Sequence, residues 1–301
     1  LLIACSPQGA TPAVFTATPI PPPTETLSAP TDASLPTATP TIAPTLPPAL
    51  GRPQYTLDLQ LNYTAKAASV NETILYPNWT GETLTNLVHA VEPNLWSGGF
   101  SLKSIAVDDQ PITNYTLENL NQRLEIQLPQ PLPPSSTITI DITYGLVLPA
   151  MQAYIDASND IRPQIYGYSD KQVNFVDWYP FVVPYIPGQG WILHNPWFYG
   201  EHLMYDLADF DVTVTFTDGA NPKVAASGSE VGLDTPALDA APTNTPSGVV
   251  SRHFVLQAGR TFALSMSDHF KVAQQTIGDV TVYSYYFGLY DAPGQAMLRT
   301  T

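Results

Sequence analysis

Hydrophobic and polar residues alternate with a period of two along most of the chain beyond Arg52. In QYTLDLQLNY, residues 54–63, every second residue is Tyr or Leu, and most of the residues between them are polar. A period of two places the apolar side chains on one face of a strand, so this segment is predicted to be a half-buried strand. The same alternation predicts further strands in QRLEIQL (122–128), TITIDITYGL (137–146), DVTVTF (211–216), RTFALSMS (260–267) and DVTVYSYYF (279–287).

Turn-forming residues separate these predicted strands. They occur in the segments DDQP (108–111), PLPPSS (131–136), TDGANP (217–222) and AGR (258–260). Many short strands joined by such turns are typical of an all-β fold, here an antiparallel sandwich or a layered, saddle-like sheet domain. The best candidate for a helix is a short piece at residues 117–120. Residues 229–248 have no periodicity and are predicted to be a long exposed loop.

The start of the chain has a different composition. Residues 6–50 are mainly Pro, Thr, Ala and Ser, and their only charged residues are Glu25 and Asp32. Such a segment cannot bury enough apolar surface to offset the loss of chain entropy on folding. Residues 6–52 are therefore predicted to be a disordered Pro/Thr-rich linker. Its proline repeats favour polyproline II, which extends by about 3 Å per residue and gives a reach on the order of 100 Å.

Cys5 is the only cysteine of the chain and follows the apolar residues LLIA. The segment LLIAC resembles a bacterial lipobox, in which cleavage leaves the cysteine as a lipidated first residue. Residues 1–5 are expected to be the remnant of a lipoprotein signal peptide cut at its start, because no initiator Met or basic region precedes them. A lipid on Cys5 would anchor the protein to the bacterial cell envelope, on its extracytoplasmic side. The alternatives are an inert buried thiol for Cys5 and an unstructured terminus without a role for the segment that follows it.

The charge of the chain excludes one class of partner. Lys and Arg number 11 against 26 Asp and Glu, which gives a formal net charge of −15. Proteins that bind nucleic acid use a basic patch to replace the counterions of the phosphate backbone, so we expect no nucleic acid partner. After Cys5, no segment has the roughly 20 consecutive apolar residues of a transmembrane helix.

The histidines do not form a recognisable zinc motif. A helical zinc site needs two histidines four positions apart. No pair has this spacing among His89, His194, His202, His253 and His269. Glu201 lies near two of them and would complete a set of three metal ligands, but the absence of helical periodicity favours histidines of a loop or of the core.

Other catalytic patterns are also incomplete. Gly228 precedes Ser229, but the rest of the nucleophile elbow Gly-x-Ser-x-Gly is missing. Spacing alone does not pair any two carboxylates for acid–base catalysis among Asp170, Asp177, Glu201, Asp206, Asp209 and Asp211. No catalytic and no metal-binding residue is therefore predicted in this chain.

The segment FVDWYPFVVPYIPGQGW, residues 175–191, combines prolines, glycines and aromatic residues in a way that no helix or regular strand can hold. One interpretation is a stacking platform for a sugar, because aromatic faces bind apolar ring surfaces. The other is an irregular loop wedged onto a sheet by its aromatic rings, with the prolines fixing its path. The second interpretation is favoured. The aromatic residues concerned, including those just after the segment, are Trp178, Tyr179, Tyr185, Trp191, Trp197 and Tyr199.

The same segment and the residues after it resemble the amino-terminal β-domain of the gluzincin aminopeptidases, the family of aminopeptidase N and leukotriene hydrolase. Bacterial members have a Trp-Tyr-Pro turn, a Gly-Trp pair, a strand of pattern Asp-Tyr-Asp-Val and an Ala-x-Gly strand end. The corresponding residues here are Trp178-Tyr179-Pro180, Gly190-Trp191, Asp209-Phe210-Asp211-Val212 and Ala226-Ser227-Gly228. Their order and spacing both fit, and the resemblance covers about residues 53–300.

The resemblance implies an aminopeptidase-like amino-terminal β-domain over residues 53–288 and the start of a missing catalytic domain over residues 289–301. In the family, zinc on a His-Glu-x-x-His helix activates the water that attacks the peptide carbonyl, and that motif is absent from this sequence. No cofactor is expected in this fragment, which should be inactive alone, and zinc is expected in the catalytic domain. The implied partners are that domain, peptide substrates and, through Cys5, a membrane.

The resemblance also implies a role for the aromatic segment. In the family this stretch lies near the catalytic domain, so the candidate residues of a loop bordering the substrate cleft are Trp178, Tyr179, Pro180 and Trp191. Gln172 and Asp170 are the nearest candidates for a substrate-facing side chain, without a clean alignment. The alternative function is a stand-alone, surface-tethered β-sandwich that binds carbohydrate through its Trp/Tyr-rich loop.

Overall fold

The computed structural model of the chain describes residues 51–151, 165–195, 203–231, 243–244, 249–278 and 280–299. The chain divides into two compact units, Leu1–Pro47 and Pro48–Thr301, and every described residue belongs to the second. The predicted lipidation site Cys5 and the predicted linker up to residue 50 therefore lie outside the described residues. Within these described ranges, no helix is long and apolar enough to cross a membrane.

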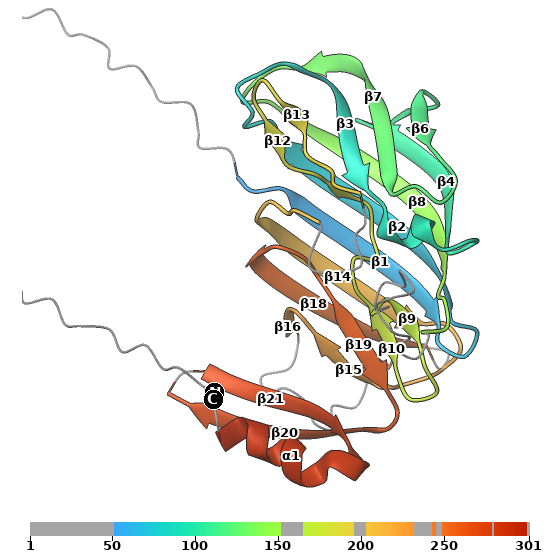
Figure 1. The fold of residues 1–301 in the computed structure, drawn as a ribbon, viewed down its shortest axis with the longest axis vertical. Coiled ribbons are helices and arrows are strands. Elements are labelled where there is room, and N and C mark those ends of the chain that lie inside the picture. The colour runs from blue at the N-terminus through green and yellow to red at the C-terminus, as the bar shows by residue number, and fades with distance from the viewer. Residues whose placement is uncertain are drawn as a thin grey trace, which may run out of the picture. The chain divides into compact units, whose positions relative to one another are not determined.

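A large central sheet holds most of the long strands. Its nine strands are β1 (Gln54–Asn62), β2 (Ala67–Pro77), β4 (Phe100–Val107), β5 (Gln110–Pro111), β8 (Thr137–Val147), β14 (Ala208–Phe216), β16 (Ser229–Glu230), β17 (Thr243–Asn244) and β18 (Val250–Gly259). Their order is β16-β18-β14-β1-β2-β8-β4-β5, with β17 also paired to β18 (Figure 1). Neighbouring strands are antiparallel, except that β1 and β14 run parallel.

Two smaller sheets and two ribbons contain the remaining described strands. The β3 sheet has the order β11-β3-β7-β6, with β3 (Leu84–Ala90), β6 (Tyr115–Leu117), β7 (Arg123–Leu132) and β11 (Phe181–Val182). The β19 sheet has the order β15-β19-β10-β9, with β9 (Gly167–Tyr168), β10 (Val173–Phe175), β15 (Lys223–Ala226) and β19 (Leu264–Ser267). The ribbons pair β12 (Tyr185–Ile186) with β13 (Gly190–Trp191), and β20 (Phe270–Ile277) with β21 (Val280–Phe287).

Helices are few and short in the described part of the chain. They are the 3-10 helix η1 (Glu92–Leu95), the 3-10 helix η3 (Gly288–Tyr290), the α-helix α1 (Asp291–Ala296) and the 3-10 helix η4 (Met297–Arg299). Figure 1 shows α1 lying along the β20–β21 ribbon. The hydroxyl of Ser284 in β21 donates a hydrogen bond of 2.8 Å to the carbonyl of Gly294 in α1, which fixes the helix to this ribbon.

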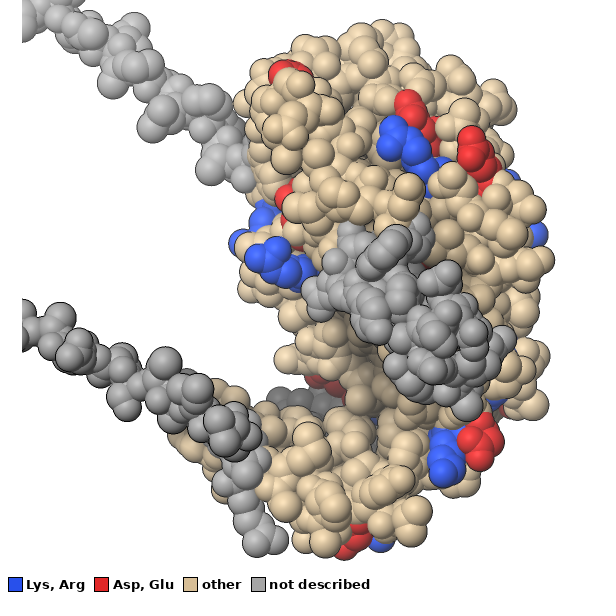
Figure 2. Space-filling model, in the orientation of Figure 1, with Lys and Arg blue, Asp and Glu red and all other residues tan. Residues whose placement is uncertain are grey.

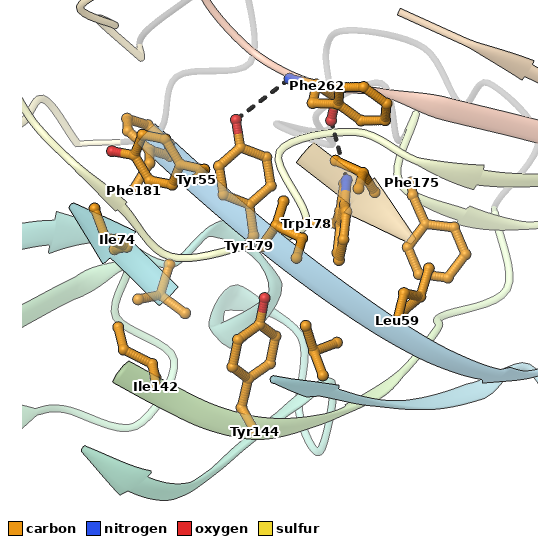
Figure 3. Packing of buried hydrophobic residues seen from close by; sticks show 14 of the residues in the cluster. Tyr55, Leu59, Ile74, Ile142, Tyr144, Phe175, Trp178, Tyr179, Phe181 and Phe262 are labelled. Carbon is orange, nitrogen blue, oxygen red and sulfur yellow. Dashed lines mark hydrogen bonds between the residues drawn. The ribbon is translucent and has the colours of Figure 1, made fainter. Parts of the chain in front are cut away.

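One apolar core joins the three sheets, because the alternation of each long strand turns every second side chain inward. In β1, Tyr55, Leu57, Leu59 and Leu61 are buried and the residues between them are more exposed. Figure 3 shows members of this core from several strands pointing toward one another. Burial of this kind is the main stabilising term of a folded domain.

The structure confirms the predicted all-β, mainly antiparallel fold. The predicted strands are present as β1, β7, β8, β14, β19 and β21. The suggested helix at residues 117–120 is wrong: Leu117 ends β6, where it pairs with Leu124, and Leu120 has a φ of 55°, which no right-handed helix contains. The predicted loop at 229–248 includes the short strands β16 and β17, because both find pairing positions along β18.

Candidate functional site

The aromatic segment at residues 175–191 is an irregular path between short strands. It leaves β10 at Phe175, touches the β3 sheet through β11, and turns back on itself through the β12–β13 ribbon. Gly188 and Gly190 make this last turn possible, because their φ values of 76° and 89° strain any residue that carries a Cβ. The prolines between the short strands fix φ and remove amide donors, so no long regular strand forms here.

The first aromatic residues of this segment are interior residues. Trp178 has 0% of its surface exposed, and its indole Nε1 donates a hydrogen bond of 3.0 Å to the carbonyl of Phe262. The hydroxyl of Tyr179 accepts a hydrogen bond of 3.3 Å from the amide of the same Phe262 (Figure 3). Pro180 is also buried. These contacts are those of a segment wedged onto a sheet, and the ring of Trp178 is not available for stacking on a sugar.

The end of the segment is closer to the surface. Trp191 is half-buried and packs edge-on against Tyr185, with 5.0 Å between ring centroids. Its Nε1 donates a hydrogen bond of 3.2 Å to the side-chain oxygen of Asn86, and the hydroxyl of Tyr185 donates one of 2.5 Å to Glu82. The β12–β13 ribbon is thus attached to β3 and to the turn before it. Trp197 and Tyr199 lie outside the described residues.

A small hollow lies beside the buried part of the segment. Its volume of about 10 Å³ has room for about one water molecule. Tyr179 and Val182 form one side, and Tyr76, Asp206 and Arg260 bring polar groups to it. Burial raises the pKa of Asp206, and the charge of Arg260 opposes this rise. The hollow is too small for a substrate, so it is part of the packing of the domain.

The segment is also held by residues that the sequence did not single out. The hydroxyl of Tyr55 in β1 accepts a hydrogen bond of 3.1 Å from the amide of Val182. Tyr205 donates a hydrogen bond to the carboxylate of Asp177, and its ring packs 4.6 Å from that of Phe181. No sequence signal marks these partners, because they come from strands and loops far away along the chain.

The histidines of the described residues have separate surroundings. His89 is buried in β3, His194 is exposed and its carbonyl accepts a hydrogen bond from Gln122, and His253 contacts Asp211 at 2.8 Å. His269 is exposed. Glu201 and His202, the other members of the metal site considered above, lie outside the described residues. Across the described ranges, no group of three or more His, Cys, Asp or Glu side chains is arranged to hold a metal ion.

The described candidate carboxylates contact other residues of the sheets and turns. Asp209 forms an ion pair with Arg52, with 2.9 Å between Nε and Oδ1, and accepts the amide of Ala258, so its pKa is lowered despite its partial burial. Asp170 and Gln172 belong to a turn closed by the backbone of Ser169. Ser229 begins β16, where it pairs with Val255. These contacts stabilise turns and strand ends.

Two residues of the motifs, Phe210 and Gly228, are closely packed against neighbouring strands. Phe210 of β14 pairs with Tyr55 across the parallel β1–β14 contact, and their rings stack with 5.3 Å between centroids. Gly228 ends the Ala-Ser-Gly motif, and a Cβ atom placed on it would lie 2.4 Å from the carbonyl oxygen of Val255. Only glycine allows the backbone to approach β18 this closely.

Replacing Gly228 with alanine is expected to lower the free energy of unfolding by about 1–3 kcal/mol, because backbone atoms must move to make room. Urea unfolding followed by tryptophan fluorescence measures this change. The matched control is Gly51→Ala, since a Cβ at Gly51 meets nothing within 4 Å, and its effect should stay within about 0.5 kcal/mol. Equal effects of the two substitutions would contradict the close approach.

The chain resembles known proteins in structure and not in sequence. No protein-family model matches the chain, and no curated protein sequence matches it. Solved structures do match it. They are M1 zinc metallopeptidases. This is the family that the sequence motifs resemble.

Three of these M1 zinc metallopeptidase structures have nearly the same similarity to the chain. One from Deinococcus radiodurans, bound to a Tyr-Ser-Ala substrate, is 16% identical, and the match covers 77% of this chain and 46% of that one with a TM-score of 0.47. Another from Deinococcus radiodurans is 17% identical over 78% of this chain and 46% of that one, with a TM-score of 0.47. A two-domain M1 zinc metallopeptidase bound to L-arginine is 18% identical over 77% and 46%, again with a TM-score of 0.47. The chain spans about half the length of the M1 structures that it matches.

Proposed function

We propose that this chain is the amino-terminal β-domain of a zinc aminopeptidase of the gluzincin type, and that it borders the peptide-substrate cleft without catalysing the reaction. The observation that carries the proposal is the ordered set of motifs from Trp178 to Gly228. Three of its residues have defined packing: Trp178 is buried, Phe210 stacks on Tyr55, and Gly228 lies so close to β18 that a Cβ would clash. Motif residues that are packed into the core in this way support the proposal of a shared domain architecture.

In this proposal the zinc ion is bound by another domain of the enzyme. The described residues do not fit a zinc site, because no three of their His, Cys, Asp or Glu side chains are arranged to hold a metal ion. Zinc and the general base would therefore belong to a catalytic domain after this one. The contribution of the present residues would be to shape and support the cleft.

Support for a partner domain comes from the end of the described chain. Leu289 of η3 is 84% exposed, and Tyr290 and Met297 are also exposed large apolar side chains on the same short run of helices. Exposed apolar residues that cluster in this way are typical of a contact surface. We assign this surface to the catalytic domain, with the boundary between the two domains at about residue 288.

In this proposal the aromatic segment is the part of the domain that borders the cleft. The buried rings of Trp178 and Tyr179 and the buried Pro180 would hold its shape, while the half-buried Trp191 and the exposed Ile186 of the β12–β13 ribbon would face the cleft. Figure 2 shows that charged side chains are few and scattered on the face in view. Such a surface suits contact with another protein domain.

The proposed location rests on the sequence of the first unit. A lipid on Cys5 and the proline-rich linker up to residue 52 would tether the domain to the outside of a bacterial envelope. Metabolic labelling with a fatty-acid probe tests this part: wild type should be labelled, and Cys5→Ser should not.

The catalytic part of the proposal has a direct test. The 301-residue chain alone should bind less than stoichiometric zinc and should not hydrolyse aminoacyl reporters, whereas the product of the reading frame extended beyond Thr301 should do both. The extended frame should encode His-Glu-x-x-His. Stoichiometric zinc in the chain alone, or a stop codon directly after Thr301, would overturn the proposal.

A further inference from the structure

A carboxylic acid lies on the interior face of the central sheet. Glu72 of β2 is 1% exposed and occupies an interior position of the strand alternation, next to Leu57 of β1 and Ile142 of β8. Both of its carboxyl oxygens are buried without a hydrogen-bond partner among the described residues. A charge in such surroundings is costly, whereas the protonated acid is tolerated.

Only tyrosines among the described titratable groups act on Glu72. The hydroxyl of Tyr144 in β8 is close enough to lower the pKa of Glu72, but burial outweighs this effect and raises the pKa well above its usual value. Burial raises the pKa of Tyr55 in β1 and of Tyr179 in the aromatic segment, and the charge of Glu72 adds to both rises. None of the described Lys, Arg or His side chains compensates its charge, so burial favours the neutral form of Glu72 in the folded protein.

A histidine is buried in the facing β3 sheet. His89 is 0% exposed, pairs with Leu124 of β7 and Val182 of β11, and both of its ring nitrogens are buried without a side-chain or backbone hydrogen bond of ordinary geometry. Burial lowers the pKa of His89 to about 3, and the nearby backbone of Leu124 opposes this shift. No titratable side chain of the described residues contributes. His89 is therefore neutral in the folded protein at all but strongly acidic pH.

We propose that Glu72 and His89 are a built-in pH-sensitive pair whose joint contribution to the stability of the domain is greatest in mildly acidic solution. Each group is held neutral inside the core and becomes charged only by leaving it. Rising pH therefore favours unfolding through Glu72, and falling pH favours unfolding through His89.

The range follows from the ordinary pKa values of the unfolded chain, about 4.3 for Glu and 6.5 for His. The pKa of Glu72 is raised by folding, so its contribution is complete below about pH 4.3 and is lost as pH rises toward the folded value. The pKa of His89 is lowered by folding, so its contribution is complete above about pH 6.5 and is lost as pH falls toward 3. As pH rises from about 4.3 to 6.5, the stability lost through Glu72 and the stability gained through His89 cancel. Below this range only His89 changes the stability with pH, and above it only Glu72 does.

The test compares the unfolding equilibrium of the 301-residue chain with that of Glu72→Gln and His89→Gln between pH 4 and 9. Other carboxylates also titrate, so the ratio of the folding constant of each variant to that of wild type is the quantity measured. For Glu72→Gln this ratio should rise about tenfold per pH unit above about pH 4.3. For His89→Gln the ratio should rise about tenfold for each unit by which the pH falls below about 6.5. Glu118→Gln is the surface control, and a substitution at this exposed position should change the folding constant by no more than about twofold.

A second measurement does not depend on the variants folding. In wild type labelled with ¹³C at glutamate carboxyls, one carboxyl signal should stay at its protonated position at pH 7, and one histidine ring should stay neutral at pH 5. A constant ratio for either core variant overturns the proposal, and so does a spectrum in which every glutamate is ionised at pH 7.

Discussion

Replacing Trp178 with alanine is expected to lower the free energy of unfolding by about 3–5 kcal/mol. The substitution removes a fully buried ring that contacts Phe175 and Tyr179 with centroid distances of 5.5 and 5.4 Å. It also leaves the carbonyl of Phe262 without its hydrogen-bond donor. Both the cavity and the unpaired acceptor destabilise the folded state.

Trp79 provides the matched control for this experiment. Its side chain is 43% exposed, so Trp79→Ala should change the free energy of unfolding by no more than about 1 kcal/mol. Urea unfolding followed by far-UV circular dichroism reports on both variants without depending on the deleted fluorophore. A loss below about 1 kcal/mol in Trp178→Ala would mean that the aromatic segment is not fixed to the core as described.

Replacing Asn78 with leucine is expected to cost about 3 kcal/mol. Its buried side-chain amide donates hydrogen bonds of 2.9 Å to the carbonyls of Glu82 and Leu132, and its side-chain oxygen accepts from the amide and hydroxyl of Thr80. Leucine has a similar size but no polar atoms, so the carbonyl of Leu132 loses this donor and Thr80 loses its acceptor, whereas the carbonyl of Glu82 retains the hydroxyl of Thr80. The cost arises from unsatisfied polar groups rather than from a cavity.

Asn114 is the appropriate comparison, because it begins another Asn-x-Thr sequence but has an exposed side chain. Asn114→Leu should alter stability by less than about 0.5 kcal/mol in the same thermal and urea measurements. If both substitutions had the same effect, the turn at residues 78–82 would not depend on its buried amide.

The fold class was predictable because the strand signal is local. A period of two over nine or more residues, as in β1 and β8, decides which side chains turn inward whatever the partner strand is. The helix prediction at residues 117–120 was wrong because four residues are too few to show a period. There, pairing of Leu117 with Leu124 across a tight turn determined the structure.

The environment of the aromatic segment was less predictable, since burial depends on distant partners. Trp178 is buried because Phe262 lies against it, 84 positions later in the chain. The sequence left a platform and a wedge as alternatives, and both fit the composition. Glu72 was overlooked although a signal existed: it stands in the same alternation phase as Val70 and Ile74, where an apolar residue is expected.

The parallel pairing of β1 with β14 has a consequence for synthesis of the chain. Arg52, just before β1, forms its ion pair with Asp209, which is 157 positions later. β1 cannot complete its hydrogen bonds until β14, about 150 residues later, has been synthesised and has left the ribosome. Until β14 emerges, one edge of β1 stays open and able to pair with the wrong strand, so nascent chains that stop before residue 216 should be prone to aggregate.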